Sequence, residues 1–120
     1  MPIKILKEDR LFSDWIRERD HWTCTRCGKY YPEGERQGLH CSHFWGRGEW
    51  ATRLDPKNAT AHCYGCHQYL TARPEEFRQW KLKRIGKDEY KKLTQRAHKN
   101  KPKAQAIKEF YVWYSGGQNA

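Results

Sequence analysis

Apolar residues near the start of the chain recur at helical spacing. The segment KEDRLFSDWIRERD, from Lys7 to Asp20, has acidic residues early and arginines late, as the helix dipole favours. Its periodic positions are Leu11, Phe12, Trp15, Ile16 and Arg19. This pattern predicts one amphipathic helix, and we expect its apolar face to pack on the unit that follows.

The middle of the chain is expected to form a hairpin followed by a helix. The residues from Leu39 to Trp45 are rich in leucine and aromatic side chains and predict a short strand. After a turn that contains two glycines, Trp50 to Leu54 is predicted to return as the second strand. Asp55 to Asn58 has the composition of a turn, and a helix is predicted from Tyr64 to Thr71.

Three more helices are predicted after Ala72. Pro74 suits the first turn of one helix, which Gly86 ends, and a second helix spans Lys87 to Lys99. The last helix carries an aromatic stripe at positions i, i+3, i+4 and i+7, namely Ile107, Phe110, Tyr111 and Tyr114. Such a stripe packs in a core or in a subunit interface, and the second alternative would make the protein a homodimer.

The composition indicates one domain that needs an added staple. An apolar fraction of 37% is low for a 120-residue core, and nothing approaches the ~18 apolar residues of a membrane span. The opening residues, MPIKILKEDR, have no apolar run of the secretory type. We therefore expect a reducing cytoplasm, that of the host cell if a phage encodes the chain, and no membrane partner.

The net charge of +10 indicates a polyanionic partner such as DNA. The charge is unevenly distributed, because residues 1–71 carry 11 basic against 9 acidic residues and residues 72–120 carry 13 against 5. We expect the C-terminal part to contact the phosphates, although a solvated helical surface would show the same lysines.

Two pairs of cysteines have the spacing of zinc knuckles. Cys24 and Cys27 form the first Cys-x-x-Cys pair, and Cys63 and Cys66 form the second. Four thiolates complete a tetrahedral zinc shell without an open position, so the ion would be structural. The fifth cysteine, Cys41, is expected to be a small buried hydrophobic residue on the strand.

Two histidines and an asparagine lie inside this cysteine frame. His43 falls on the expected hairpin, Asn58 lies before the second cysteine pair, and His67 directly follows it. One imidazole can bind a divalent metal while the other, neutral near its pKa of about 6.5, takes a proton from water. The side-chain amide of Asn58 is suited to hold the loop or His43 by hydrogen bonds.

This His-Asn-His order resembles that of the HNH nucleases, also called ββα-metal or His-Me finger nucleases. The segments FSDWIRERDHWTCTRCGK, HFWGRGEWATRLDPKNATAHCYGC and IGKDEYKKLTQRAHK resemble the NinG (Rap) family of phage recombination endonucleases over about residues 10–110. The resemblance implies an α+β fold with a treble-clef zinc unit, a ββα-metal motif, an N-terminal helix and C-terminal helices. It also implies hydrolysis of DNA in branched recombination intermediates such as Holliday junctions, D-loops and forks.

By position in that family, His43 would be the general base, Asn58 the residue that holds the loop and His67 a ligand of the catalytic metal. Arg47 and Arg53 would clamp the scissile phosphate. This chain departs from the HNH pattern at the second metal ligand, because many HNH nucleases have Asp or His where this chain has Ser42.

His40 is the favoured replacement for that ligand, with Asp55, Glu49 or waters and substrate phosphate as alternatives. Because imidazole binds transition metals well, Mn, Ni or Zn would support activity beside Mg. Cleavage should leave a 5′-phosphate and a 3′-hydroxyl.

The predicted organisation has three parts: a helical segment over residues 1–22, a zinc-stapled HNH core over residues 23–71, and a basic DNA-binding or dimerisation segment over residues 72–120. The leading hypothesis is a metal-dependent DNA endonuclease. One alternative is an HNH enzyme that nicks ordinary duplex, for example in DNA packaging. The other is a zinc module that binds nucleic acid without cleaving it.

Overall fold

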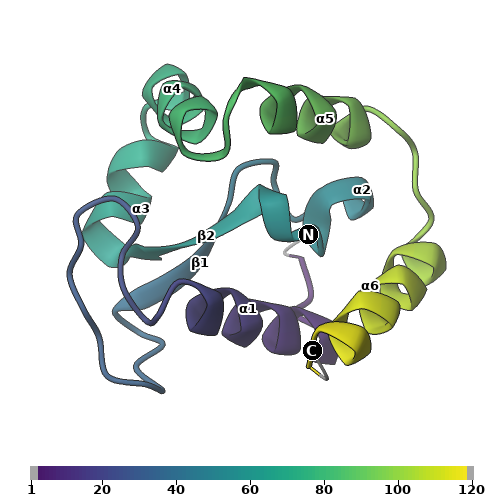
Figure 1. The fold of residues 1–120 in the computed structure, drawn as a ribbon, viewed down its shortest axis with the longest axis horizontal. Coiled ribbons are helices and arrows are strands. Elements are labelled where there is room, and N and C mark those ends of the chain that lie inside the picture. Colours follow the sequence, from purple (N-terminus) through teal and green to yellow (C-terminus); the bar gives the residue numbers. More distant parts are fainter. Residues whose placement is uncertain (1–2, 119–120) are drawn as a thin grey trace.

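The computed structural model describes residues 3–118 and has an α+β fold (Figure 1). Within these residues a two-stranded sheet is surrounded by six α-helices. In chain order the elements are α1 (Lys7–Arg19), β1 (Leu39–His43), α2 (Trp50–Arg53), the 3-10 turn η1 (Pro56–Asn58), β2 (Ala59–Cys63), α3 (Tyr64–Thr71), α4 (Pro74–Ile85), α5 (Lys87–Ala97) and α6 (Lys103–Gln118).

The sheet is an antiparallel hairpin whose second strand differs from the prediction. β1 pairs with β2 so that His40 lies opposite His62 and His43 lies opposite Ala59. The predicted return strand from Trp50 to Leu54 is wrong, because Trp50–Arg53 forms the short helix α2. All five residues of β2, ATAHC, are buried, so the strand lacks the alternation that identifies a strand in a sequence.

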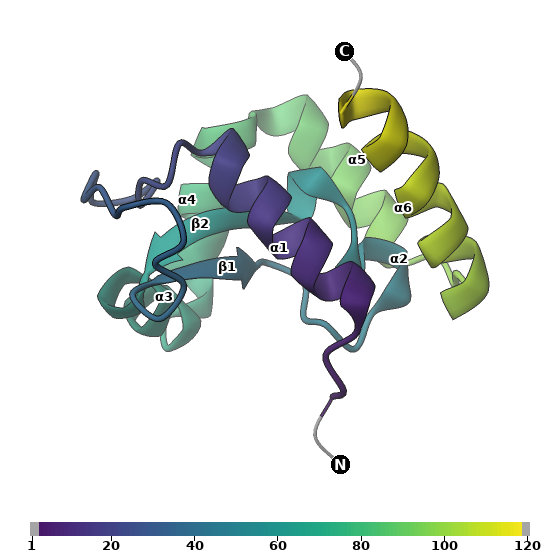
Figure 2. The same ribbon diagram turned by 90° about the horizontal axis from the view of Figure 1, so that it is seen from below.

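Helix α1 covers one face of the hairpin, as its apolar stripe predicts. Phe12 and Ile16 are fully buried there with Cys41 and Ala59 of the two strands. The aromatic stripe of α6 packs on α1, with Phe110 6.4 Å from Phe12 between ring centroids (Figure 2). The stripe therefore belongs to the core, and the homodimer stays a prediction without support from these side chains.

Helices α3, α4 and α5 close the opposite side of the hairpin, so that β2 lies between α1 and α4 in Figure 1. Pro74 opens α4, and Gly86 separates α4 from α5 with a φ of +87°, a conformation that favours glycine. Aromatic rings of Phe77 and Trp80 on α4 pack against His62 of β2. Within residues 3–118, no helix combines the length and the hydropathy that a bilayer crossing requires.

Candidate metal centres and histidine site

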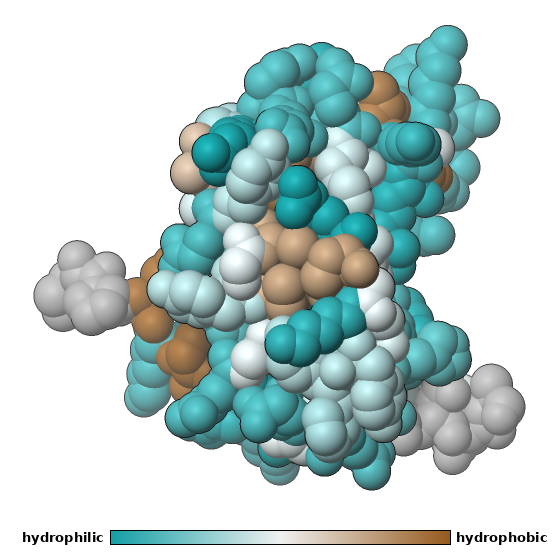
Figure 3. Space-filling model, turned by 90° about the vertical axis from the view of Figure 1, so that its left-hand side faces the viewer, coloured by the Kyte–Doolittle hydropathy of each residue, from teal (hydrophilic) through white to brown (hydrophobic). Residues whose placement is uncertain are grey.

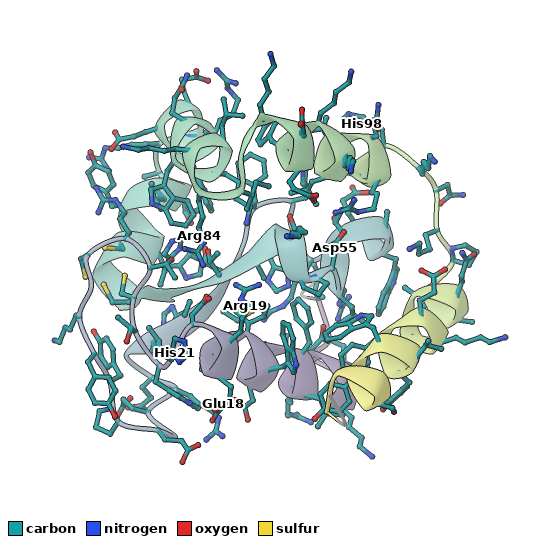
Figure 4. All side chains as sticks on the ribbon, viewed as in Figure 1. Glu18, Arg19, His21, Asp55, Arg84 and His98 are labelled. Atoms are coloured by element: carbon teal, nitrogen blue, oxygen red, sulfur yellow. The ribbon has the colours of Figure 1, made fainter. Side chains whose placement is uncertain are left out.

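The four predicted zinc ligands come together at one end of the hairpin. The sulfur atoms of Cys24, Cys27, Cys63 and Cys66 all lie within 4.8 Å of one another. The first two lie in a loop after α1, and the other two flank the start of α3, so the cluster joins segments 36 residues apart (yellow atoms, Figure 4). This face of the molecule is largely hydrophilic, with a small hydrophobic patch near its centre (Figure 3).

The donors around these sulfurs fit a thiolate-bound cation. Backbone N–H groups of Cys27 and Cys66 point at the sulfurs of Cys24 and Cys63, at 3.5 Å and 3.4 Å. Burial alone would raise the pKa of Cys24, but hydrogen bonds from backbone N–H groups outweigh it and lower the pKa to about 7. Burial raises the pKa of Cys66 to about 12, a cost that a bound divalent cation would remove.

The imidazole of His43 is held by a backbone carbonyl. Its Nε2 lies 3.0 Å from the carbonyl oxygen of Arg53, so in the neutral ring Nε2 donates and Nδ1 keeps a free lone pair. Burial, and then the positive charge of Arg47, lowers the pKa of His43 to about 4. The ring is therefore neutral at pH 7 and can accept a proton at Nδ1.

Asn58 fixes the loop between β1 and α2, next to the helix that supplies the Arg53 carbonyl. The side chain is fully buried, its Oδ1 accepts the Trp45 N–H at 2.8 Å, and its Nδ2 donates to the carbonyls of Trp45 and Thr52. The Asn58 backbone oxygen also accepts the N–H of Phe44. These bonds span both ends of the loop between β1 and α2, so the residue holds the loop in the manner expected of it.

His67 and His40 meet on the α3 side of the hairpin. Their Nδ1 atoms are 3.0 Å apart, and His40 Nε2 lies 2.9 Å from the carbonyl of Gln37. Two nitrogens that bind one ion at about 2.1 Å each lie about 3.0 Å apart in an octahedral shell and about 3.4 Å apart in a tetrahedral one. Burial, then His40 and Arg47, lowers the pKa of His67, which keeps its ring neutral and able to bind a metal.

The two histidine groups occupy different faces of β1. His40 and His43 are three positions apart on the strand, so their side chains point to opposite faces, and the His43 ring lies 5.8 Å from that of Phe12 on α1. The half-buried Arg47 links the two groups, because its charge lowers the pKa of both His43 and His67. The two groups thus lie on opposite faces of β1, and Arg47 is near enough to act on both.

Arg53 has a different place from the one expected by resemblance. The residue is 4% exposed, and its guanidinium forms a paired hydrogen bond with Asp9 of α1, at 2.6 Å and 2.9 Å. It also donates to the carbonyl of Lys4 and stacks on Trp50. These contacts leave it poorly placed to clamp a phosphate. Arg47, whose Nε is buried without a partner among the described residues, is better placed.

Replacing Asp9 by asparagine should lower the free energy of unfolding by about 3–5 kcal/mol, because it leaves the buried Arg53 charge unpaired. Urea unfolding of the zinc-loaded protein measures this. Glu75→Gln is the control, since Glu75 pairs with Arg78 on the exposed surface of α4 and the change should leave stability nearly unaltered. Equal, small effects of both changes would show that the Arg53 guanidinium is not held by this pair.

Several other polar side chains lie near the hairpin. A cavity of about 480 Å³ beside α1 is lined by four arginines and two carboxylates, namely Arg10, Arg17, Arg36, Arg47, Asp9 and Asp14. The hydroxyl of Ser42 is buried without a partner among the described residues, on the same strand face as His40. On the neighbouring strand His62 is fully buried, and neither ring nitrogen has a partner within the described part of the chain.

The comparisons identify one family. A family model described as "Bacteriophage Lambda NinG protein" matches residues 5–118. Neither the search of curated proteins nor the search of solved structures found a match.

Proposed function

Because the chain belongs to the phage lambda NinG protein family, which is linked to recombination, we propose that it is a metal-dependent DNA endonuclease of the HNH (ββα-metal) type. The observation that carries this proposal is the hydrogen bond from His43 Nε2 to the carbonyl of Arg53. It fixes the tautomer in which Nδ1 is a base, beside a loop held by Asn58.

In the proposed reaction, Nδ1 of His43 takes a proton from a water molecule as the water oxygen attacks the scissile phosphorus. The bond between phosphorus and the 3′ oxygen breaks, which leaves a 5′-phosphate and a 3′-hydroxyl once the 3′ oxygen gains a proton from solvent. Arg47 would donate to a non-bridging phosphate oxygen and stabilise the charge that develops there. The low pKa of His43 keeps the base unprotonated at pH 7.

A divalent metal would supply Lewis-acid stabilisation of the phosphate and the leaving oxygen. His67 and His40 would hold it, since their Nδ1 atoms are already adjacent. The unpartnered hydroxyl of Ser42 faces the same side of the strand and is a neutral oxygen, so water or substrate would complete the shell. A set of two imidazoles favours Mn, Ni or Zn at least as much as Mg.

The substrate we propose is branched DNA, bound mainly through its phosphates. Two regions rich in basic residues support this proposal: the cavity beside α1, where four arginines outnumber Asp9 and Asp14, and residues 72–120, which carry 13 basic against 5 acidic residues. Two separate regions can hold two duplex arms and so distinguish a junction by its shape. The alternatives remain an enzyme that nicks ordinary duplex and a zinc module that binds without cleaving.

The proposal is tested by incubating the zinc-loaded protein with linear duplex, fork and four-way junction at matched salt, each with Mg or Mn. We expect the junction or fork to be cut faster than the duplex, with products that a ligase can reseal because they carry 5′-phosphate ends. Equal cutting of all three substrates would support the duplex-nicking alternative. Binding without cutting under every metal would leave the non-catalytic module.

A further inference from the structure

A second cationic pocket lies away from the histidine site, between the end of α1, β2 and α4. It has a volume of about 360 Å³, and its lining includes Arg19, Lys57, Thr60, Lys81 and Arg84. Arg19 and Arg84 approach from α1 and α4, on either side of β2 (Figure 4). Four of these five side chains are basic, Thr60 is neutral, and none is acidic.

The positive charge of this pocket is poorly balanced. Asp20 forms ion pairs with both Arg19 and Arg84, at 3.0 Å and 3.2 Å, and so one carboxylate serves two guanidiniums. The other nearby carboxylate, Asp55, is bound to Arg96 at 2.6 Å. No acidic side chain is left to pair with Lys81 among the described residues.

Lys81 is the least expected member of the pocket. It is 1% exposed, yet its charge is met by no hydrogen bond within residues 3–118. Burial, and then Arg19 and Arg84, lowers its pKa to about 7. A buried lysine without a partner lowers the stability of the fold, and a bound anion would offset this cost.

Thr60 provides a second unsatisfied group at the same place. Its side chain is 2% exposed, and its Oγ1 has no hydrogen-bond partner among the described residues. The Lys81 ammonium, the Thr60 hydroxyl and the Arg84 guanidinium around one space form a set of donors that suits a tetrahedral oxyanion. Arg19 adds mainly its charge, because its guanidinium already donates to Asp20 and to the carbonyls of Pro56 and Ala59. A metal cation is excluded from this pocket by its charge.

We propose that the pocket formed by Arg19, Thr60, Lys81 and Arg84 binds a backbone phosphate of a nucleic-acid strand, at a position separate from the scissile one. The inference rests on the DNA partner of the proposed function, but not on cleavage. α4 belongs to the basic C-terminal region, and the exposed Lys57 extends the positive surface beside the pocket. The pocket would fix the register of one strand relative to the free edge of β1.

The test compares Lys81→Met with Lys83→Met. Lys83 lies two residues further along α4 and is exposed. Both changes replace a lysine by methionine on the same helix, so they differ in position only. In the absence of added divalent metal, Lys81→Met should weaken binding of a DNA duplex by about tenfold and reduce the salt-dependence slope by about one ion. Lys83→Met should change the affinity by less than about twofold. Lys81→Met should also unfold at the same or a higher temperature, because it removes a buried charge.

Two further measurements make the test specific. At pH 8, DNA binding to wild type should take up protons, seen as a buffer-dependent heat in calorimetry, because the phosphate restores the charge on Lys81. Lys81→Met should lose this uptake.

A deoxynucleoside monophosphate is the second probe, and we expect it to bind far more weakly than the strand. Equal affinities of the two variants would overturn the proposal, as would a Lys81-dependent site that takes the mononucleotide but not the duplex. If the protein cuts no DNA and Lys81 still controls binding, only the proposed cleavage fails.

Discussion

Replacing His43 by alanine should lower the rate of DNA cleavage by about 10²–10⁴-fold, the usual contribution of a general base. The reason is local: without the imidazole nothing at this position accepts the proton of the attacking water. Affinity for DNA should change little, because the phosphate contacts that we propose come from arginines and lysines elsewhere. Single-turnover cleavage of a junction with Mn measures the rate, and a binding assay without metal measures the affinity.

Two variants separate chemistry from folding in this experiment. His98→Ala is the matched control, since His98 is exposed and its Nδ1 lies 2.7 Å from the carbonyl of Thr94. Its ring packs edge-on against Trp45 without a hydrogen bond to that loop within residues 3–118, so the variant should cut close to the wild-type rate. His43→Gln retains a side-chain donor for the Arg53 carbonyl but lacks a base, and should be as slow as the alanine variant. If folded His43→Ala, with its zinc bound, cuts as fast as wild type, the assignment of the base is wrong.

Removing zinc from the cysteine cluster should unfold the protein. A structural zinc ion contributes about 10–16 kcal/mol in small zinc domains, whereas whole domains are stable by about 5–15 kcal/mol. We expect about one tightly bound zinc per chain in metal analysis, and loss of the circular-dichroism signal of the helices when a strong chelator removes it. The loss should reverse when zinc is returned under reducing conditions.

Cysteine variants identify which thiols hold the ion. Cys63→Ser should lose zinc and misfold, because Cys63 both lies in the cluster and caps α3. Cys41→Ala is the control: Cys41 lies in the core with α1, is 6% exposed and should keep its zinc although it loses some packing. Two disulfides found by mass spectrometry in place of zinc would contradict the assignment.

The longer helices and the cysteine cluster could be predicted because their signals are local, whereas the sequence pattern of the four-residue helix α2 predicts a strand. Helix α1 follows from an apolar stripe, α4 from Pro74 and Gly86, and the cluster from two short spacings. β2 could not be predicted, because both of its faces are covered and every residue is buried. The charged partner of Arg53 is 44 residues away, a distance over which no local pattern operates.

The hydrogen bonds of Asn58 are the part of the candidate site closest to a local pattern. Asn58 contacts a loop close to it in sequence, so such contacts could be inferred from position, whereas the catalytic and metal-binding roles stay predictions. The position of Lys81 carries a weaker signal in the sequence. It lies four residues after Phe77, so both residues fall on the side of α4 that faces the core. A lysine in an apolar stripe is worth examining as a ligand site.

The contacts of Arg53 have a consequence for any attempt to shorten this protein. Its main-chain oxygen aims the ring of His43, while its side chain is anchored to Asp9 on α1. The orientation of the imidazole that we propose as the base thus depends on a carboxylate contributed by the first ten residues. A minimal fragment cut from residues 23–71 would contain all four thiols and both candidate metal-binding imidazoles, yet would leave the base without its alignment.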